Sequence, residues 1–254
     1  MGKFGCNKVN KDFRDYKLKS VRAMDFPSSY RIDKNLKIKD QGWVNSCVAH
    51  SLSSFEECVY NKEFSTDFIY GYRPATYFQG EGMNMRDALH TLITRGDCLN
   101  DMLPGNTEVP KVYDKVKANS TTYILQAFPY KVKSYARIFT KNQIKEVLLR
   151  DIPVPVSIPV RSDLQVIGDM IEYNKEEPIT GYHAILIIGY TPLGYIVQNS
   201  WGNDWGENGT AILPYEYPLD SAWAINVDDE VAIKEPLRWL AVIGNFIYNL
   251  FKRN

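Results

Sequence analysis

The sequence predicts an α+β protein in which a helical lobe precedes a β-rich lobe. In the first half of the chain apolar residues recur at spacings of three and four, as they do along one face of a helix. After residue 150 the pattern changes to short runs rich in Val and Ile, broken by Gly, Pro and Asn, which is typical of strands. A chain of 254 residues, 44% of them apolar, can bury a sizeable core but is short for two independent domains. Helices followed by strands therefore favour one domain with two lobes.

Residues 1–25 are expected to form an exposed arm ahead of the ordered body. Met1 to Arg22 carries seven basic and two acidic side chains, and it contains no apolar segment of the kind that marks a secretory signal. We interpret the arm as a short pro-segment or plug that lies across a cleft, with a mobile tail as the alternative. Pro27 disfavours helix at the residue before it, so the body starts in extended form at Phe26.

Three helices are predicted from their ends and their apolar faces. The first begins at or next to Cys47, the second is capped by Asn84 and stops at Gly96, and the third opens with a capping box over residues 140–143. Their apolar stripes comprise Val48, Leu52, Phe55 and Val59; Met85, Ala88, Leu89, Leu92 and Ile93; and Ile144, Val147 and Leu148.

Strands are predicted over residues 153–160, 183–190, 195–198, 210–213 and 223–227. Beyond them, residues 236–253 are strongly apolar, with aromatic side chains and a basic end. This segment is too short and too interrupted for a predicted membrane span. We expect it to pack on the body or dock on a partner, with contact to a membrane surface as the alternative.

The overall composition limits the kinds of partner and cofactor that we expect. Lys plus Arg and Asp plus Glu number 30 each, so the chain has no net charge and no basic domain, and we expect no nucleic-acid partner. The four cysteines follow no repeating spacing and form no CxxC pair. We therefore expect free thiols, no metal and no cofactor, and a cytoplasmic or viral location.

Cys47 is the first candidate for chemistry. It follows a turn and stands at the start of a helix, where unpaired N–H groups and the helix dipole favour an anion. A thiol in that position loses its proton more easily, and the thiolate is the nucleophile. The alternative is a small buried hydrophobic residue, which is what most free cysteines are.

His183 and Asn199 are the candidates to assist that thiol. His183 opens an apolar strand, where an ionisable ring needs a partner. Asn199 ends another strand, and its amide oxygen can accept the ring N–H, with Trp201 screening the bond from water. These are the parts of a nucleophile, base and orienting group. His50 lies on the helix face next to that of Cys47, and His90 lies off its apolar stripe, so neither is expected to act.

Three separated motifs resemble those of the papain-like cysteine peptidases: Gln41-Gly42 with Ser46-Cys47, His183-Ala184 with Gly189-Tyr190, and Asn199-Ser200-Trp201-Gly202 with Trp205-Gly206-Glu207-Asn208-Gly209. His183 and Asn199 follow Cys47 by 136 and 152 residues, close to the spacing of roughly 130–150 residues in that family. Further segments are similar to its bacterial branch: residues 12–16, 26–29, 68–70, 86–89, 96–98 and 213–217.

The resemblance implies a papain-like two-lobed fold with a helical N-terminal lobe and an antiparallel, β-barrel-like C-terminal lobe. The cleft would lie between the lobes, within a domain of residues 26–230 whose helical lobe covers about 41–130 and whose β lobe covers about 131–230. Cys47 would be the nucleophile, His183 the general base and acid, and Asn199 its orienting residue. Gln41 would donate its amide to the oxyanion. Residues 231–254 lie outside the resemblance as an apolar extension.

The sequence also departs from the family pattern. Val44 stands where the family has a disulfide cysteine, and Val48 where it has a tryptophan. Gly82 and Met83 stand where a glycine pair holds extended substrate by its backbone, so the Met83 side chain is expected to crowd that surface. Together with Trp201, these two are the expected substrate-binding residues.

The expected function is therefore hydrolysis of peptide bonds in peptide or protein substrates through a thioester intermediate. Two alternatives remain open at this stage. One is a papain-fold amide hydrolase or acyltransferase that acts on a cell-wall peptide or a non-protein amide. The other is a self-processing or structural protein of a viral assembly.

Overall fold

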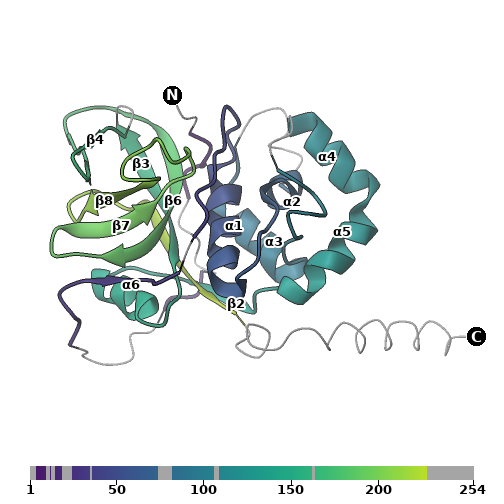
Figure 1. Cartoon of the computed structure of the whole chain (residues 1–254), viewed down its shortest axis with the longest axis horizontal. Coiled ribbons are helices and arrows are strands. Elements are labelled where there is room, and N and C mark those ends of the chain that lie inside the picture. The colour runs from purple at the N-terminus through teal and green to yellow at the C-terminus, as the bar shows by residue number, and fades with distance from the viewer. Residues whose placement is uncertain are drawn as a thin grey trace, which may run out of the picture.

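The computed structural model has helices on one side and a sheet on the other, with α1 between them (Figure 1). It describes residues 4–9, 12, 15–18, 25–34, 36–73, 82–105, 109–161 and 164–227. The predicted C-terminal segment 231–254 and part of the arm lie outside these residues. The two-sided arrangement confirms the predicted α+β class.

The three predicted helices are present with the predicted ends. α1 begins at Cys47, and α3 is capped by the Asn84 side chain, which accepts from the Arg86 N–H. α6 opens with the capping box of Thr140 and Gln143. The helices span Cys47–Tyr60 (α1), Thr66–Gly71 (α2), Met85–Thr94 (α3), Val109–Ala118 (α4), Ser120–Ala127 (α5) and Lys141–Leu148 (α6), with a short 3₁₀ turn at Phe128–Tyr130 (η2). Among them, none is long and apolar enough to cross a membrane.

The described strands form one mixed sheet. Its order is β2-β9-β3-β6-β7-β8-β5-β4, and β1 pairs with β6. All these pairs are antiparallel except β5–β8, which is parallel. The strands span Tyr30–Arg31 (β1), Ser134–Arg137 (β2), Val154–Arg161 (β3), Val166–Ile167 (β4), Met170–Ile171 (β5), Ile179–Tyr190 (β6), Gly194–Gln198 (β7), Thr210–Pro214 (β8) and Ser221–Asn226 (β9).

β6 is the strand against which the helical side packs. Its residues Ala184, Leu186 and Ile188 share one buried apolar cluster with α1. The Ser51 hydroxyl of α1 donates to the Ile185 carbonyl at 3.1 Å. The start of α1 is thereby held beside the stretch of β6 that carries His183.

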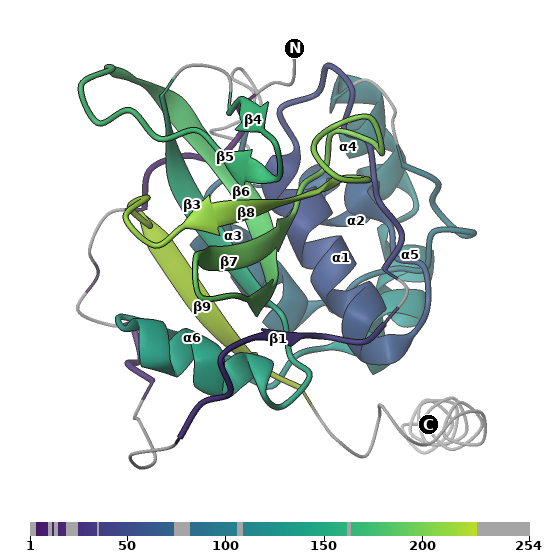
Figure 2. The same ribbon diagram turned by 60° about the vertical axis from the view of Figure 1, so that its left-hand side comes forward.

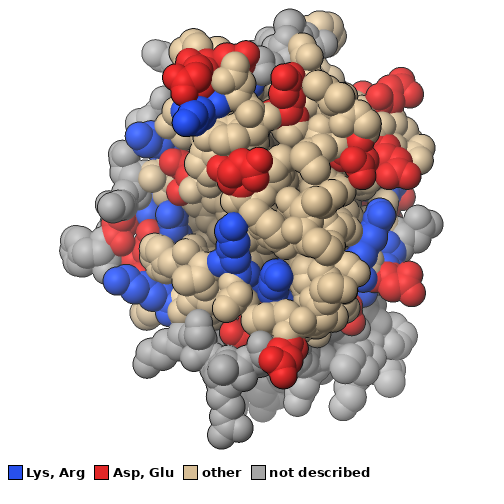
Figure 3. Space-filling model, turned by 90° about the vertical axis from the view of Figure 1, so that its left-hand side faces the viewer, with Lys and Arg blue, Asp and Glu red and all other residues tan. Residues whose placement is uncertain are grey.

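α6 lies on the sheet side, away from α1 to α5 (Figures 1 and 2). Its apolar face joins the second large cluster, which lies inside the β-rich lobe. The outer face of this lobe carries basic and acidic side chains interspersed with one another (Figure 3). That face therefore offers no uniformly basic surface.

Candidate active site

Cys47 is the first residue of α1, and the preceding turn is fixed from both sides. The Asp40 carboxylate accepts from the Gly42 N–H at 2.8 Å, and Gly42 has the positive φ of +54° that this turn requires. The Gln41 N–H donates to the Ser200 carbonyl at 2.9 Å. The turn is therefore tied to the loop that follows β7, so the thiol and the Asn199 segment are positioned together.

His183 lies on β6 and is oriented by Asn199 at the end of β7. Its Nε2 lies 2.7 Å from Asn199 Oδ1, which also accepts from the Ser200 N–H at 2.8 Å. The other ring nitrogen, Nδ1, is buried and has no hydrogen-bond partner among the described residues. The Trp201 ring covers the imidazole, with the ring centroids 4.8 Å apart.

The Cys47 sulfur of α1 lies against β6, next to His183. It accepts the N–H of Ala184, the residue after His183, at 3.4 Å. The structure thus brings the predicted nucleophile to the predicted base. His50 is directed elsewhere: its Nδ1 lies 3.0 Å from the Ser46 carbonyl oxygen, within its own helix turn. His90 is exposed, as expected.

Gln41 is buried next to this pair, and its amide is held at both ends. The Ser200 hydroxyl donates to Oε1 at 2.7 Å, and Nε2 donates to the Val44 carbonyl at 2.9 Å. Sequence reasoning missed the role of Ser200. Its position directly after Asn199 was the available signal, because a residue that follows the orienting amide must lie near the turn before Cys47.

The N-terminal arm lies in the cleft and pairs with its walls. Cys6 and Met83 form a parallel bridge in which the Met83 N–H donates to the Gly5 carbonyl at 2.9 Å and the Asn7 N–H donates to the Met83 carbonyl at 3.0 Å. The Cys6 N–H donates to the Tyr182 carbonyl at 3.2 Å. With the arm in place the Met83 side chain is fully buried, and its backbone pairs with an extended segment in spite of that side chain.

The arm covers Cys47 and His183. Phe4 packs against both His183 and Trp201, with ring centroids 6.1 and 6.0 Å apart. Gly5 fits so closely that a Cβ there would lie 2.0 Å from the Asn45 carbonyl oxygen. Cys47 and His183 are both 0% exposed.

Burial by these surroundings keeps both groups neutral. It raises the pKa of the Cys47 thiol to about 11, although N–H groups of Ala184, Gly5 and Val48 stabilise the thiolate. Burial likewise lowers the pKa of His183 to about 4, although the bond to Asn199 favours the protonated ring. All four cysteines are free, as the sequence predicts, and all four are buried, including Cys6 of the arm that was expected to be exposed.

Comparison with known proteins agrees with this geometry. The profile described as "Papain family cysteine protease" matches residues 75–217, a span that includes His183 and Asn199. A peptidase C1-like protein of Acanthamoeba polyphaga mimivirus is 27% identical over 210 residues, which are 71% of this chain and 65% of that protein. A cathepsin L-like proteinase of Fasciola hepatica is 28% identical over 68% of this chain and 55% of its own length. The chain thus spans about half to two thirds of these relatives.

Solved structures extend the similarity to most of the chain. Xylellain, a cysteine protease from Xylella fastidiosa, superposes with a TM-score of 0.77 at 25% identity, over 89% of this chain and 96% of that one. A procathepsin B of Trypanosoma congolense has the same fold, with a TM-score of 0.71 at 16% identity over 89% of this chain and 86% of its own. The chain belongs to the papain family of cysteine proteases.

Proposed function

We propose that the chain is a cysteine peptidase that uses Cys47 and His183 to hydrolyse peptide bonds in peptide or protein substrates. One observation carries this proposal. Asn199 engages His183 Nε2, so Nδ1 remains for the thiol, whose sulfur lies against the next residue of β6. A base held by an orienting amide beside a nucleophile is the arrangement that acyl transfer requires.

The reaction starts when the Cys47 thiol passes its proton to His183 Nδ1. The thiolate attacks the peptide carbonyl carbon, and the oxyanion accepts hydrogen bonds from the Cys47 N–H and the Gln41 amide. The C–N bond then breaks as His183 gives its proton to the leaving amine. Water, deprotonated by the same imidazole, hydrolyses the thioester and releases the acid. Ser200 supports this scheme because its hydroxyl fixes the Gln41 amide.

We also propose that residues 4–9 of the arm hold the site in a closed, inactive state. The arm takes the backbone hydrogen bonds of Met83 and Tyr182 that would otherwise serve an extended substrate. The Gly5 N–H of the arm also hydrogen-bonds to the Cys47 sulfur, so the arm occupies the position that a substrate would need.

The peptidase proposal is tested in the chain with Gly5→Val, because a side chain at position 5 would collide with the Asn45 backbone and displace the arm. This protein is incubated with a mixed peptide library under reducing conditions, and the products are sequenced by mass spectrometry. Cys47→Ala should abolish cleavage. Cys98→Ala is the matched control, because Cys98 is also a buried free thiol but belongs to a cluster on the helical side. Added to Gly5→Val, it should leave the products unchanged.

Labelling with an epoxysuccinyl thiol reagent separates the remaining function classes. Selective modification of Cys47 with no peptide cleaved would favour an amide hydrolase or acyltransferase on the same scaffold. Absence of both cleavage and selective modification, in a folded protein with the arm displaced, would contradict the enzymatic assignment.

A further inference from the structure

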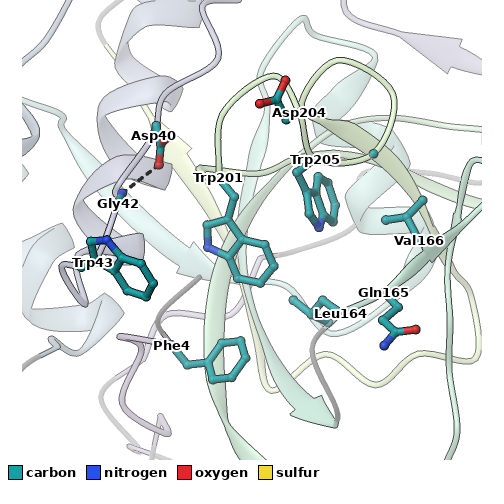
Figure 4. Close-up of a pocket in the computed structure, with 11 residues that line it drawn as sticks. Phe4, Asp40, Gly42, Trp43, Leu164, Gln165, Val166, Trp201, Asp204 and Trp205 are labelled. Carbon is teal, nitrogen blue, oxygen red and sulfur yellow. Dashed lines mark hydrogen bonds between the residues drawn. The ribbon is translucent and has the colours of Figure 1, made fainter. Parts of the chain in front are cut away.

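A hollow of about 560 Å³ opens beside Trp201. Figure 4 shows its walls, with Trp201 between Trp43 and Trp205 and with Phe4 at one edge. The Trp201 and Trp205 rings meet edge to face, with centroids 6.0 Å apart. Trp43 is 70% exposed, which is unusual for an indole that no ligand covers.

The hollow lies on the leaving-group side of the proposed reaction. The arm marks the direction of the cleft, because Cys6 pairs with Met83 and Tyr182 at one end and Phe4 reaches Trp201 at the other. Trp201 stacks on His183, the group that must protonate the departing amine. The part of a peptide that follows the scissile bond therefore continues from His183 over Trp201 into this hollow.

The charged groups that line the hollow are all acidic. Asp40 and Asp204 reach it from the two loops that flank Trp201, and among the described residues no Lys or Arg lines it. Asp40 is fixed in place, since its carboxylate accepts from Gly42 and would lie 3.3 Å from a Cβ on Gly202. Asp204 is exposed at the rim.

We propose that this hollow selects substrates with a Lys or Arg side chain in the segment that follows the scissile bond. The inference rests on the proposed peptidase function. Indole faces attract ammonium and guanidinium groups through their quadrupole, and Arg most often uses this contact. The Asp40 and Asp204 carboxylates supply the countercharge, and the same side chains repel an acidic residue.

The test uses the full-length chain with Gly5→Val, which displaces the arm, and three quenched peptides that differ only in Lys, Gln or Glu after the scissile bond. We expect kcat/KM to fall in the order Lys, Gln, Glu. Asp204→Asn should lower the Lys-to-Gln ratio by about twofold to fivefold, as for an exposed ion pair. Asp204→Lys should make kcat/KM higher for the Glu peptide than for the Lys peptide. Because the group is exposed, added salt should weaken the preference.

Glu216→Lys is the matched control, because it makes the same charge change at an exposed position of the β lobe outside the hollow. We expect it to leave the order of the peptides as it was. The inference is overturned if Asp204→Lys leaves the order unchanged, or if Glu216→Lys reverses it equally.

Binding separates this inference from the peptidase proposal. In full-length Cys47→Ala with Gly5→Val, the affinities of the same three peptides are read from tryptophan fluorescence. Charge-selective binding that Asp204→Lys inverts, with no cleavage by the unblocked Cys47 enzyme, would support the hollow and contradict the peptidase. Cleavage without charge selectivity would support the peptidase proposal and contradict the proposed role of the hollow.

Discussion

Displacing the arm should switch the Cys47 thiol from inert to reactive, and Gly5→Val is the sharpest way to do so in the full chain. A Cβ at position 5 would lie 2.0 Å from the Asn45 carbonyl oxygen and 2.2 Å from its carbon. Both are backbone atoms of the turn before α1, so the neighbour cannot swing aside. The arm must therefore leave its place above Cys47.

The size of this effect on the closed state is estimated from the hydrogen bonds that the arm loses when it leaves. Three backbone hydrogen bonds join it to Met83 and Tyr182. At about 0.5–1.5 kcal/mol each, their loss weakens the closed state by roughly 1.5–4.5 kcal/mol, which is about a 10-fold to 10³-fold change in the ratio of closed to open molecules.

The assay is the rate of Cys47 alkylation by iodoacetamide as a function of pH, read by peptide mapping. With the arm in place the thiol has a pKa of about 11, so the wild-type rate should be low at neutral pH and should rise steadily as the pH is raised. Opening removes the burial that raises this pKa and lowers that of His183. The Gly5→Val rate should therefore be at least tenfold higher at pH 7 and should level off at a lower pH.

Lys8→Val is the matched control, because Lys8 belongs to the same arm but its side chain is exposed. It should label at the wild-type rate. Equal rates for Gly5→Val and the wild type, with unchanged circular dichroism, would refute the reasoning, since the site would then be closed by something other than the arm.

Two further predictions concern the oxyanion donor and the core. Gln41→Ala, measured in the Gly5→Val background, should lower kcat by about 10²–10³ with little change in KM; a fall of less than threefold would remove Gln41 from the mechanism. Glu56 and Asp97 are buried together near Lys39, Glu57 and Cys98. Burial is the largest cause that raises the pKa of both carboxyl groups, and the charge of Asp97 raises the pKa of Glu56 further. In the unfolded chain Glu56 ionises near its ordinary pKa of about 4.5, so the contribution of Glu56 to the free energy of unfolding should be largest below that pH and should fall as the pH rises. In urea unfolding between pH 4 and 8, Glu56→Gln should therefore become more stable relative to the wild type as the pH rises, and Glu63→Gln, whose carboxyl is exposed, should not; a constant difference between Glu56→Gln and the wild type would contradict the assignment.

Prediction from the sequence succeeded where the signal is local. The α1 start at Cys47, the Asn84 cap and the Thr140–Gln143 capping box were all read correctly, because a cap and an apolar stripe depend on residues within one or two turns. The short strands β4 and β5 were missed. They have two residues each, and they are defined by their pairing with each other and with β8. The sequence therefore contains no run of strand-forming residues from which they could be predicted.

For the candidate site, the sequence alone determined the chemical inventory: a thiol at a helix start, a histidine on a buried strand, and an amide and a tryptophan after the next. Each residue type is demanded by its task, and the motifs are short enough to survive as patterns. Only the tertiary structure determined how these groups are arranged and what covers them. The route of the arm past Met83, the closure of Cys47 and the hollow beside Trp201 depend on contacts between segments far apart in the chain, and no local pattern encodes which of those contacts form.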